Sequence, residues 1–151
     1  TPIRVIVPGK VFRNEATDAT HEAQFCQLEG LCVDKDINLG HLKGTIEHFF
    51  SKFFAGEVEV RFRPSFFPFV EPGVEIDMML KESDSKLANK WIEVMGAGMV
   101  HPNVLKASGI DPEVYSGFAF GMGIDRLAVM KYGINDVRDL YTGDLRFVNQ
   151  F

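Results

Sequence analysis

The stretch that most restricts the fold of this chain covers residues 117–130, GFAFGMGIDRLAVM. In an extended strand, successive side chains point to opposite faces. One face of this strand would carry only small residues, Gly117, Ala119, Gly121 and Gly123, and the other would carry Phe118, Phe120 and Met122. Glycine weakens a strand, so a face of four small residues indicates that something other than a side chain lies against it.

A helix is predicted to follow this strand directly. The apolar spacing becomes helical at Ile124, Leu127, Ala128 and Met130, and the apolar stripe ends near Gly133. Arg126 then falls in the first helical turn, where free N–H groups and a guanidinium together would bind an anion such as phosphate. The alternative is a glycine-rich core strand whose Arg126 pairs with a carboxylate.

Composition narrows the class of function. The chain has 151 residues, 46% of them hydrophobic, which is enough to bury the core of one domain. Its formal net charge of −5 argues against a general nucleic-acid-binding surface, so any RNA contact should be local or made by a partner. The two cysteines, Cys26 and Cys32, fit neither a zinc site nor a disulfide framework. No apolar run approaches the ~18 residues of a membrane span, so we expect a cytoplasmic protein without membrane contact.

The overall pattern predicts an α+β fold with a largely antiparallel sheet, because strands outnumber helices and no βαβ alternation occurs. Strands are expected at residues 3–7 and 11–14, around a turn at Pro8-Gly9, and at residues 23–33, 57–63, 74–81, 90–100 and 117–123. Besides the helix after residue 123, helices are expected at 39–55, between Asn38 as N-cap and Gly56, and at 101–108. Residues 82–89 should form a polar hairpin loop, and residues 145–151 a short amphipathic segment.

Two segments are rich in phenylalanine. The helix at 39–55 carries apolar residues over a wider arc than the ~100° of a simple surface helix, so its rings either cover the chain's own sheet or meet a partner chain. Residues 65–72, SFFPFVEP, include two prolines and three phenylalanines. Proline cannot donate to a sheet ladder, so this segment should be an edge strand or a pocket wall.

Polar side chains gather on one face of the strand at 23–33. Phe25, Gln27 and Glu29 alternate onto this face, and an aromatic ring, an amide and a carboxylate together pack poorly but can grip a polar ligand. Arg13 lies on the preceding strand, and His21 lies in the loop between the two strands. This strand-loop-strand unit would therefore hold a cation and an imidazole beside its acceptors.

These segments resemble the second and third signature motifs of class II aminoacyl-tRNA synthetases, and in particular the alpha-subunit family of bacterial-type phenylalanyl-tRNA synthetases. The matching segments are VFRNEATDATHEAQFCQLEG at 11–30, RFRPSFFPFVEPG at 61–73, GAGMVHPNVL at 96–105 and GFAFGMGIDRLAVMKYGINDVRDL at 117–140. The resemblance covers essentially the whole chain. It implies a single α+β domain at 1–151, a class II synthetase-like antiparallel sheet flanked by helices. This domain would be a truncated catalytic core, whose first motif and a His-Thr-Ser segment would lie upstream.

The resemblance implies an ATP site. Arg13 would hold the α-phosphate, and Arg126 would hold the γ-phosphate and cover the adenine, with Phe25 on the opposite side of the ring. His21 would contact the outer phosphates, and Glu15 would help to fix the nucleotide. Arg13 and Arg126 are the implied catalytic residues, because a cation placed at developing charge lowers the barrier to transfer. The alternative for His21 is an exposed loop histidine.

The resemblance also implies an amino-acid site, formed by Gln27, Glu29, Phe67, Phe69, Ala119 and Gly121. The first two would hold the α-ammonium of phenylalanine, and the two phenylalanines would meet its ring edge to face. Ala119 would lie at the far end of that ring, where its size limits what the para carbon can carry. Gly121 would belong to the floor beneath the bound adenylate.

A magnesium ion is the implied cofactor, with Glu71 as its ligand. In the family this ligand is shared with the other subunit; the alternative is a surface carboxylate on a loop. Glu75, Asp77 and Glu93 could suggest a metal cluster, but we interpret them as charges on a half-exposed sheet face.

The implied reaction has two steps: ATP-dependent formation of phenylalanyl-adenylate, then transfer of the phenylalanyl group to tRNA-Phe. The implied partner is the beta subunit, in a heterotetramer of two alpha and two beta chains. We expect the fragment alone to have little activity. The alternatives are a catalytically silent module that senses an amino acid or a nucleotide, and a purely structural subunit.

Overall fold

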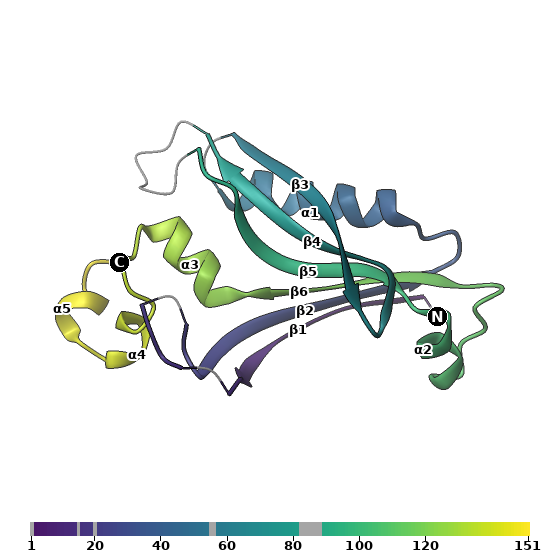
Figure 1. Ribbon diagram of the computed structural model, residues 1–151, viewed down its shortest axis with the longest axis horizontal. Coiled ribbons are helices and arrows are strands. Elements are labelled where there is room, and N and C mark those ends of the chain that lie inside the picture. Colours follow the sequence, from purple (N-terminus) through teal and green to yellow (C-terminus); the bar gives the residue numbers. More distant parts are fainter. Residues whose placement is uncertain (1, 15, 20, 55–56, 82–88) are drawn as a thin grey trace.

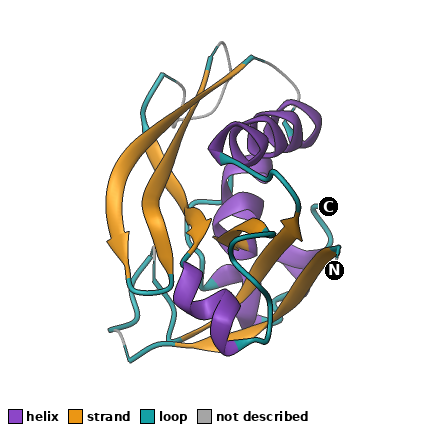
Figure 2. Ribbon diagram, turned by 90° about the vertical axis from the view of Figure 1, so that its right-hand side faces the viewer, coloured by secondary structure: helices purple, strands orange, loops and turns teal. Residues whose placement is uncertain are grey.

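The computed structural model describes residues 2–14, 16–19, 21–54, 57–81 and 89–151. These residues form a six-stranded sheet in the order β1-β2-β6-β5-β4-β3, with every neighbouring pair antiparallel (Figure 1). The strands are β1 (Ile3–Phe12), β2 (Gln24–Asp34), β3 (Val58–Phe67), β4 (Val70–Leu80), β5 (Ile92–Val100) and β6 (Ser116–Gly123). The sheet is strongly twisted, so strands at its two edges run in different directions (Figure 2). The expected antiparallel α+β architecture is confirmed.

The helices flank this sheet. They are α1 (Leu39–Phe53), α2 (Pro102–Ala107), α3 (Ile124–Tyr132), α4 (Asp139–Thr142) and α5 (Leu145–Val148). Figure 1 shows α1 lying along the sheet, α2 at one end, and α3, α4 and α5 together at the opposite end. The predicted passage from the glycine strand into a helix is confirmed, because β6 ends at Gly123 and α3 begins at the next residue.

The sequence of α1 explains both where it begins and which face it buries. Asn38 caps it, accepting hydrogen bonds from two first-turn amides, and His41 completes a capping box by accepting from the Asn38 amide. Leu42, Ile46 and Phe50, spaced four residues apart, are fully buried in the main core. The phenylalanines of α1 therefore cover the chain's own sheet. The helix ends earlier than predicted, and the expected terminal residues 55 and 56 lie outside the described residues.

Three strand predictions were wrong at their boundaries, all because of proline. β1 is one continuous strand without a turn, since Pro8 and Gly9 pair with β2. An edge strand tolerates proline because its outer amides need no ladder partner. The same reason lets β3, at the other edge, continue past Pro64 to Phe67, so the expected edge strand is confirmed for residues 65–67. Residues 70–72, expected in an edge segment or a pocket wall, instead begin the inner strand β4, where the register shifts between Val70 and Gly73. The predicted hairpin loop at 82–89 lies outside the described residues except for its last position.

On one face of the sheet, a row of paired residues crosses the centre and has two glycines in its middle. Paired residues of an antiparallel sheet share a face, and the row runs from Glu29 through Gly121 and Gly96 to Glu75 and Arg63. A Cβ atom on Gly96 would lie 2.9 Å from the ring of Phe67. The phenylalanine ring therefore lies directly on the β5 backbone, where only glycine leaves room for it.

The core arrangement predicts a large penalty for truncating Phe50. We expect Phe50→Ala to lower the free energy of unfolding by about 3–5 kcal/mol, because the ring is fully buried and leaves a cavity. Phe66→Ala is the matched control, since that ring is 79% exposed, and it should cost no more than about 0.5 kcal/mol. Urea unfolding of both variants measures the difference. A loss below about 1 kcal/mol for Phe50→Ala would contradict the assignment of this core.

Candidate active site

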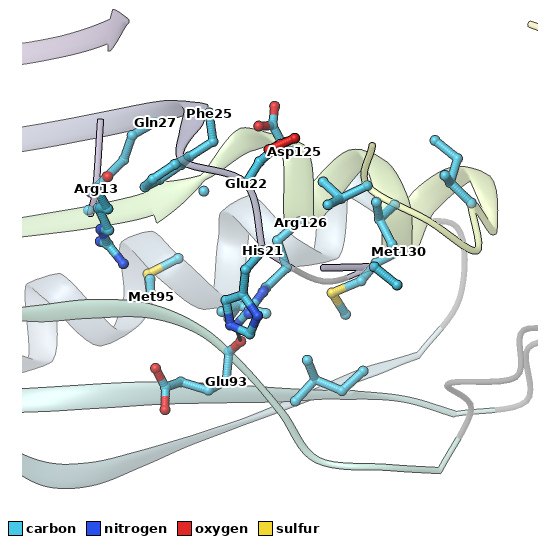
Figure 3. Close-up of a pocket in the computed structure, with 18 of the residues that line it drawn as sticks. Arg13, His21, Glu22, Phe25, Gln27, Glu93, Met95, Asp125, Arg126 and Met130 are labelled. Atoms are coloured by element: carbon cyan, nitrogen blue, oxygen red, sulfur yellow. Dashed lines mark hydrogen bonds between the residues drawn. The ribbon is translucent and has the colours of Figure 1, made fainter. Parts of the chain in front are cut away.

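A cavity of about 840 Å³ lies where β2, β5, β6 and α3 meet. Its lining includes six of the residues predicted from the sequence: Arg13, His21, Phe25, Gln27, Gly121 and Arg126 (Figure 3). Residue 15, the seventh candidate in this region, lies outside the described residues. The structure therefore brings together side chains from opposite ends of the chain, including both predicted arginines.

Arg13 and Phe25 form a pair at the β2 side of the cavity. The Arg13 amide donates a hydrogen bond to the carbonyl of Ala23 at 2.9 Å, which fixes the start of the loop against its end. The Arg13 guanidinium carbon lies 4.9 Å from the centroid of the Phe25 ring. At this distance the cation is attracted by the ring face. A planar group and a fixed positive charge thus share one wall.

Arg126 occupies the predicted position in the first turn of α3. Its Nη1 donates a hydrogen bond to the backbone carbonyl of Glu93 in β5 at 2.9 Å. In the part of the chain that the structure describes, this arginine pairs with no carboxylate, so the alternative interpretation of a neutralised core arginine finds no support. The N-cap Gly123 makes no side-chain cap bond and lines the same cavity. A positive helix end and a guanidinium therefore face one space, which suits an anion.

His21 is held by a neighbouring carboxylate. Its amide donates to Asp18 Oδ1 at 2.8 Å, and its Nδ1 lies 3.1 Å from the same oxygen. The imidazole is exposed and lines the cavity, and Figure 3 shows it on the Arg126 side of the space. Asp18 therefore orients a histidine that the sequence alone could place only in a loop.

Gln27 and Glu29 act as a pair on the β6 backbone. Gln27 Nε2 donates a short hydrogen bond to Glu29 Oε1. A Cβ atom on Gly121 would lie 2.7 Å from both Glu29 carboxylate oxygens and 3.0 Å from Gln27 Nε2. Because Gly121 has no side chain, the Gln27 amide and the Glu29 carboxylate can lie flat on the sheet. Their oxygen atoms are then close enough together to accept hydrogen bonds from one positively charged group.

The glycine face is not bare along its whole length. The expectation that no side chain lies against it was wrong at Gly117, where an added Cβ would come within 2.8 Å of Val33 Cγ2. It was also wrong at Gly121, which Gln27 and Glu29 cover. Ala119 packs against a second small core cluster that includes Val33 and Leu105. The small residues therefore serve the packing of β2 on β6 at one end and the cavity at the other.

Phe67 is the last residue of β3, and Phe69 lies in the turn between β3 and β4. Their rings are stacked with centroids 6.2 Å apart, and Phe67 contacts the Gly96 position in the row shared with Gly121. Phe69 is exposed, and its carbonyl accepts the amide of His101 at 3.0 Å. Neither ring lines the cavity itself. The predicted phenyl-binding pair is thus separate from the arginine end, and Phe67 alone contacts the row at Gly96.

Glu71 is exposed at the start of β4. Among the described residues, no group of three or more His, Cys, Asp or Glu side chains could hold a metal ion. The role of Glu71 as a metal ligand therefore stays a prediction.

The other acidic residues on the sheet form an ion-pair network instead of a metal site. Asp77 is only 2% exposed and is bound by Arg63 Nε and Arg61 Nε, each at 2.7 Å. Arg63 also pairs with Glu75 at 3.0 Å and with Glu93 at 3.4 Å. The hydrogen bonds from Arg63, and then from Arg61, hold the pKa of Asp77 below its usual value despite its burial. The interpretation as charges on a half-exposed sheet face agrees with the partial exposure of Glu75 and the exposure of Glu93, but it was wrong for Asp77, which is buried on the inner strand β4 and held by two arginines.

Sequence reasoning missed two groups at this site. Asp125 lines the cavity and accepts hydrogen bonds from the Cys26 amide and the Tyr141 hydroxyl. The carbonyl of Glu93 receives Arg126. Backbone acceptors have no sequence signature, but an acidic residue beside a predicted phosphate-binding arginine is a signal that could have drawn attention to Asp125.

Comparison with known proteins places the chain among tRNA synthetases. A family model described as the tRNA synthetases class II core domain (F) matches residues 1–151. The chain is 57% identical over 150 residues to the phenylalanine–tRNA ligase alpha subunit of Colwellia psychrerythraea, and 54% identical over 155 residues to that of Bacillus pumilus. These matches cover 99% of this chain but 43% and 45% of the relatives, so the chain spans less than half of their length.

The fold also matches solved structures. The pyrrolysyl-tRNA synthetase from Desulfitobacterium hafniense resembles it with a TM-score of 0.64, over 94% of this chain and 46% of that chain. The sequence identity is 18%, so this likeness concerns the fold alone. Among the described residues, no helix is both long and apolar enough to cross a membrane.

The Asp77 network predicts a pH-dependent stability. Its lowered pKa means that the stabilising charge is fully present above the unfolded value of about 3.9 and is lost as the pH falls toward the folded value. We expect Asp77→Asn to cost about 3 kcal/mol at pH 7, because two arginines lose their buried partner, and the difference should shrink below about pH 4. Urea unfolding at several pH values measures it. Glu47→Gln, which removes one exposed pair with Lys43, is the control; a difference that stays constant down to pH 3 would count against the network.

Proposed function

The chain belongs to the family of class II tRNA synthetase core domains. On this premise we propose that it is the catalytic core of a phenylalanyl-tRNA synthetase alpha subunit. The complete protein would activate phenylalanine with ATP and transfer it to tRNA-Phe. The observation that carries the proposal is the cavity that unites Arg13, Phe25 and Arg126, in a chain 54–57% identical to proteins with that name. Because the chain spans less than half of those relatives, the activity is proposed for the longer protein.

ATP occupies the end of the site formed by the two arginines. Arg126 and the N-terminus of α3 bind the γ-phosphate, and Arg13 binds the α-phosphate, where negative charge develops during attack. His21, oriented by Asp18, contacts the outer phosphates. The adenine ring packs with Phe25, and Glu15 helps to fix the nucleotide.

Magnesium is proposed as an ion that this chain holds only in part, because the described residues offer no group of three or more His, Cys, Asp or Glu side chains that could hold a metal. Proteins commonly hold Mg²⁺ near nucleotides through one or two carboxylates together with phosphate oxygens and water. Glu71 supplies one such carboxylate, exposed at the start of β4 and so accessible to a ligand or to a second subunit. Glu71 lies outside the lining of the cavity, close to the end of β5 where Val70 pairs with Val100, so Mg²⁺ held there would be shared with a second subunit rather than form part of the arginine end of the site.

Phenylalanine occupies the end of the site nearest to Phe67. Glu29 and the amide oxygen of Gln27 accept hydrogen bonds from its α-ammonium, and the Gln27–Glu29 bond keeps these groups in place on Gly121. Phe67 and Phe69 bind the aromatic ring edge to face. Ala119, one row further along β6, limits the space beyond the para carbon.

The activation step needs positioning rather than a protein nucleophile. The carboxylate of phenylalanine attacks the α-phosphorus of ATP, the bond to pyrophosphate breaks, and phenylalanyl-adenylate forms. In the second step a hydroxyl of the terminal tRNA ribose attacks the activated carbonyl, and AMP leaves. The beta subunit, in an assembly of two alpha and two beta chains, completes the enzyme in the cytoplasm.

Loss of Arg126 tests this function most directly. We expect Arg126→Ala in the complete alpha-beta assembly to lower phenylalanine-dependent ATP–pyrophosphate exchange by roughly 100-fold or more, because a fixed cation at developing charge is removed. Arg4→Ala is the control, since Arg4 pairs with Asp34 at an exposed edge of the sheet. An unmutated assembly that binds phenylalanine and ATP but performs no exchange would favour the silent sensing module instead.

A second test concerns the choice of amino acid. Ala119→Gly should admit para-substituted phenylalanines such as p-chlorophenylalanine, raising their relative kcat/KM by about tenfold, while activity with phenylalanine changes little. Exchange assays with the two amino acids in the complete assembly measure this ratio. Unchanged discrimination would refute the role of Ala119 at the far end of the ring.

A further inference from the structure

Asp125 is a buried carboxylate in the cavity wall that the proposed reaction does not use. It is the second residue of α3, directly before Arg126, and it is only 9% exposed. The other buried charge among the described residues, Asp77, is held by two arginines. No cation pairs with Asp125 in the described part of the chain, and two neutral donors hold it instead. A buried charge without a cation is costly unless its hydrogen bonds are good, so its partners are informative.

The first donor is a strand amide at the edge of the cavity. The pairing of β2 with β6 ends at Gln27 and Gly123, so Cys26 lies one residue beyond it. The Cys26 amide donates to Asp125 Oδ2 at 3.0 Å. The Asp125 carboxylate thus accepts a hydrogen bond from a β2 amide that lies just beyond the paired part of the strand. Cys26 also stands between Phe25 and Gln27, two residues whose side chains line the cavity.

The second donor is the hydroxyl of Tyr141 in α4. It donates a short hydrogen bond to the same oxygen, Asp125 Oδ2. Burial, and then this bond, raise the pKa of the Tyr141 hydroxyl above its usual value. One carboxylate oxygen therefore joins three elements, β2, α3 and α4.

The geometry points to Asp125 as a positioning residue for the nucleotide end of the site. Its carboxylate holds the first turn of α3 at a fixed separation from β2, which sets the distance between Arg126 and Phe25. This inference rests on the proposed function, because it assigns those two side chains to ATP. The groups assigned to phenylalanine are held by other contacts: Glu29 by Gln27, and Phe67 by the glycines beneath it.

A positioning role makes a prediction that a purely structural role does not. If Asp125 sets the width of the nucleotide end, its loss should weaken ATP binding selectively. A general loss of stability would instead lower the amount of folded enzyme and affect both substrates alike.

The test uses the complete alpha-beta assembly with Asp125→Ala, Asp125→Asn and Tyr141→Phe. Calorimetric titration gives the Kd of ATP and of phenylalanine, and pyrophosphate exchange gives both KM values. We expect Asp125→Ala to raise the Kd and KM for ATP about tenfold, as expected when hydrogen bonds to a charged group are lost, and those for phenylalanine less than about twofold. Asp125→Asn keeps an acceptor and should recover most of the affinity, and Tyr141→Phe should be intermediate.

Asp144→Ala is the matched control. It removes a carboxylate that caps α5 and pairs with Arg146 away from the cavity lining, so both affinities should be unchanged. Equal changes for the two substrates, or no change for either, would overturn the positioning role, and Tyr141→Phe decides in the same way if Asp125→Ala does not fold. Absence of exchange in the unmutated assembly would overturn the proposed function, whereas the ATP-binding comparison would still decide the role of Asp125.

Discussion

The pairing of β6 with both β2 and β5 is the constraint on which the rest of the structure depends. Gly121 pairs with Glu29 on one side and with Gly96 on the other, so in one row of the sheet a carboxylate lies over the first glycine and an aromatic ring over the second. Side chains on β6 would break this row by steric contact. The opposite face of the same strand carries Phe118 and Met122 into the main core, so the packing that stabilises the sheet also sets the register of the site.

The sequence pattern predicted those features of the fold that depend on residues close together in the chain. The alternation on β6, the helix that follows it and the Asn38 cap were found because each depends on residues a few positions apart. The continuity of β1 could not be predicted, because a proline is acceptable there only on account of its place at the sheet edge. Asp125 was missed because its role also depends on a distant part of the chain: its donor on β2 lies 99 residues away.

The two buried carboxylates show two solutions to one problem. Asp77 lies on β4 beside two arginines of the edge strand β3, where opposite charges offset its desolvation. Asp125 lies in the wall of a cavity proposed to bind a polyanion, and in the described part of the chain it pairs with no arginine. Neutral donors, the Cys26 amide and the Tyr141 hydroxyl, satisfy its hydrogen bonds in place of an arginine. The placement of each carboxylate thus follows from what its surroundings must bind.

A hydrogen bond between Val137 and Ala19 affects when the cavity forms during folding. The Val137 amide donates to the Ala19 carbonyl at 3.0 Å, and both residues line the cavity. Together with the contact between Cys26 and Asp125, it joins the first and last parts of the described chain across the cavity. Contacts of such long sequence separation carry a large loop-closure cost and form slowly. The cavity therefore becomes complete only when nearly the whole chain has folded. A ligand bound there stabilises the entire sheet rather than a few of its strands.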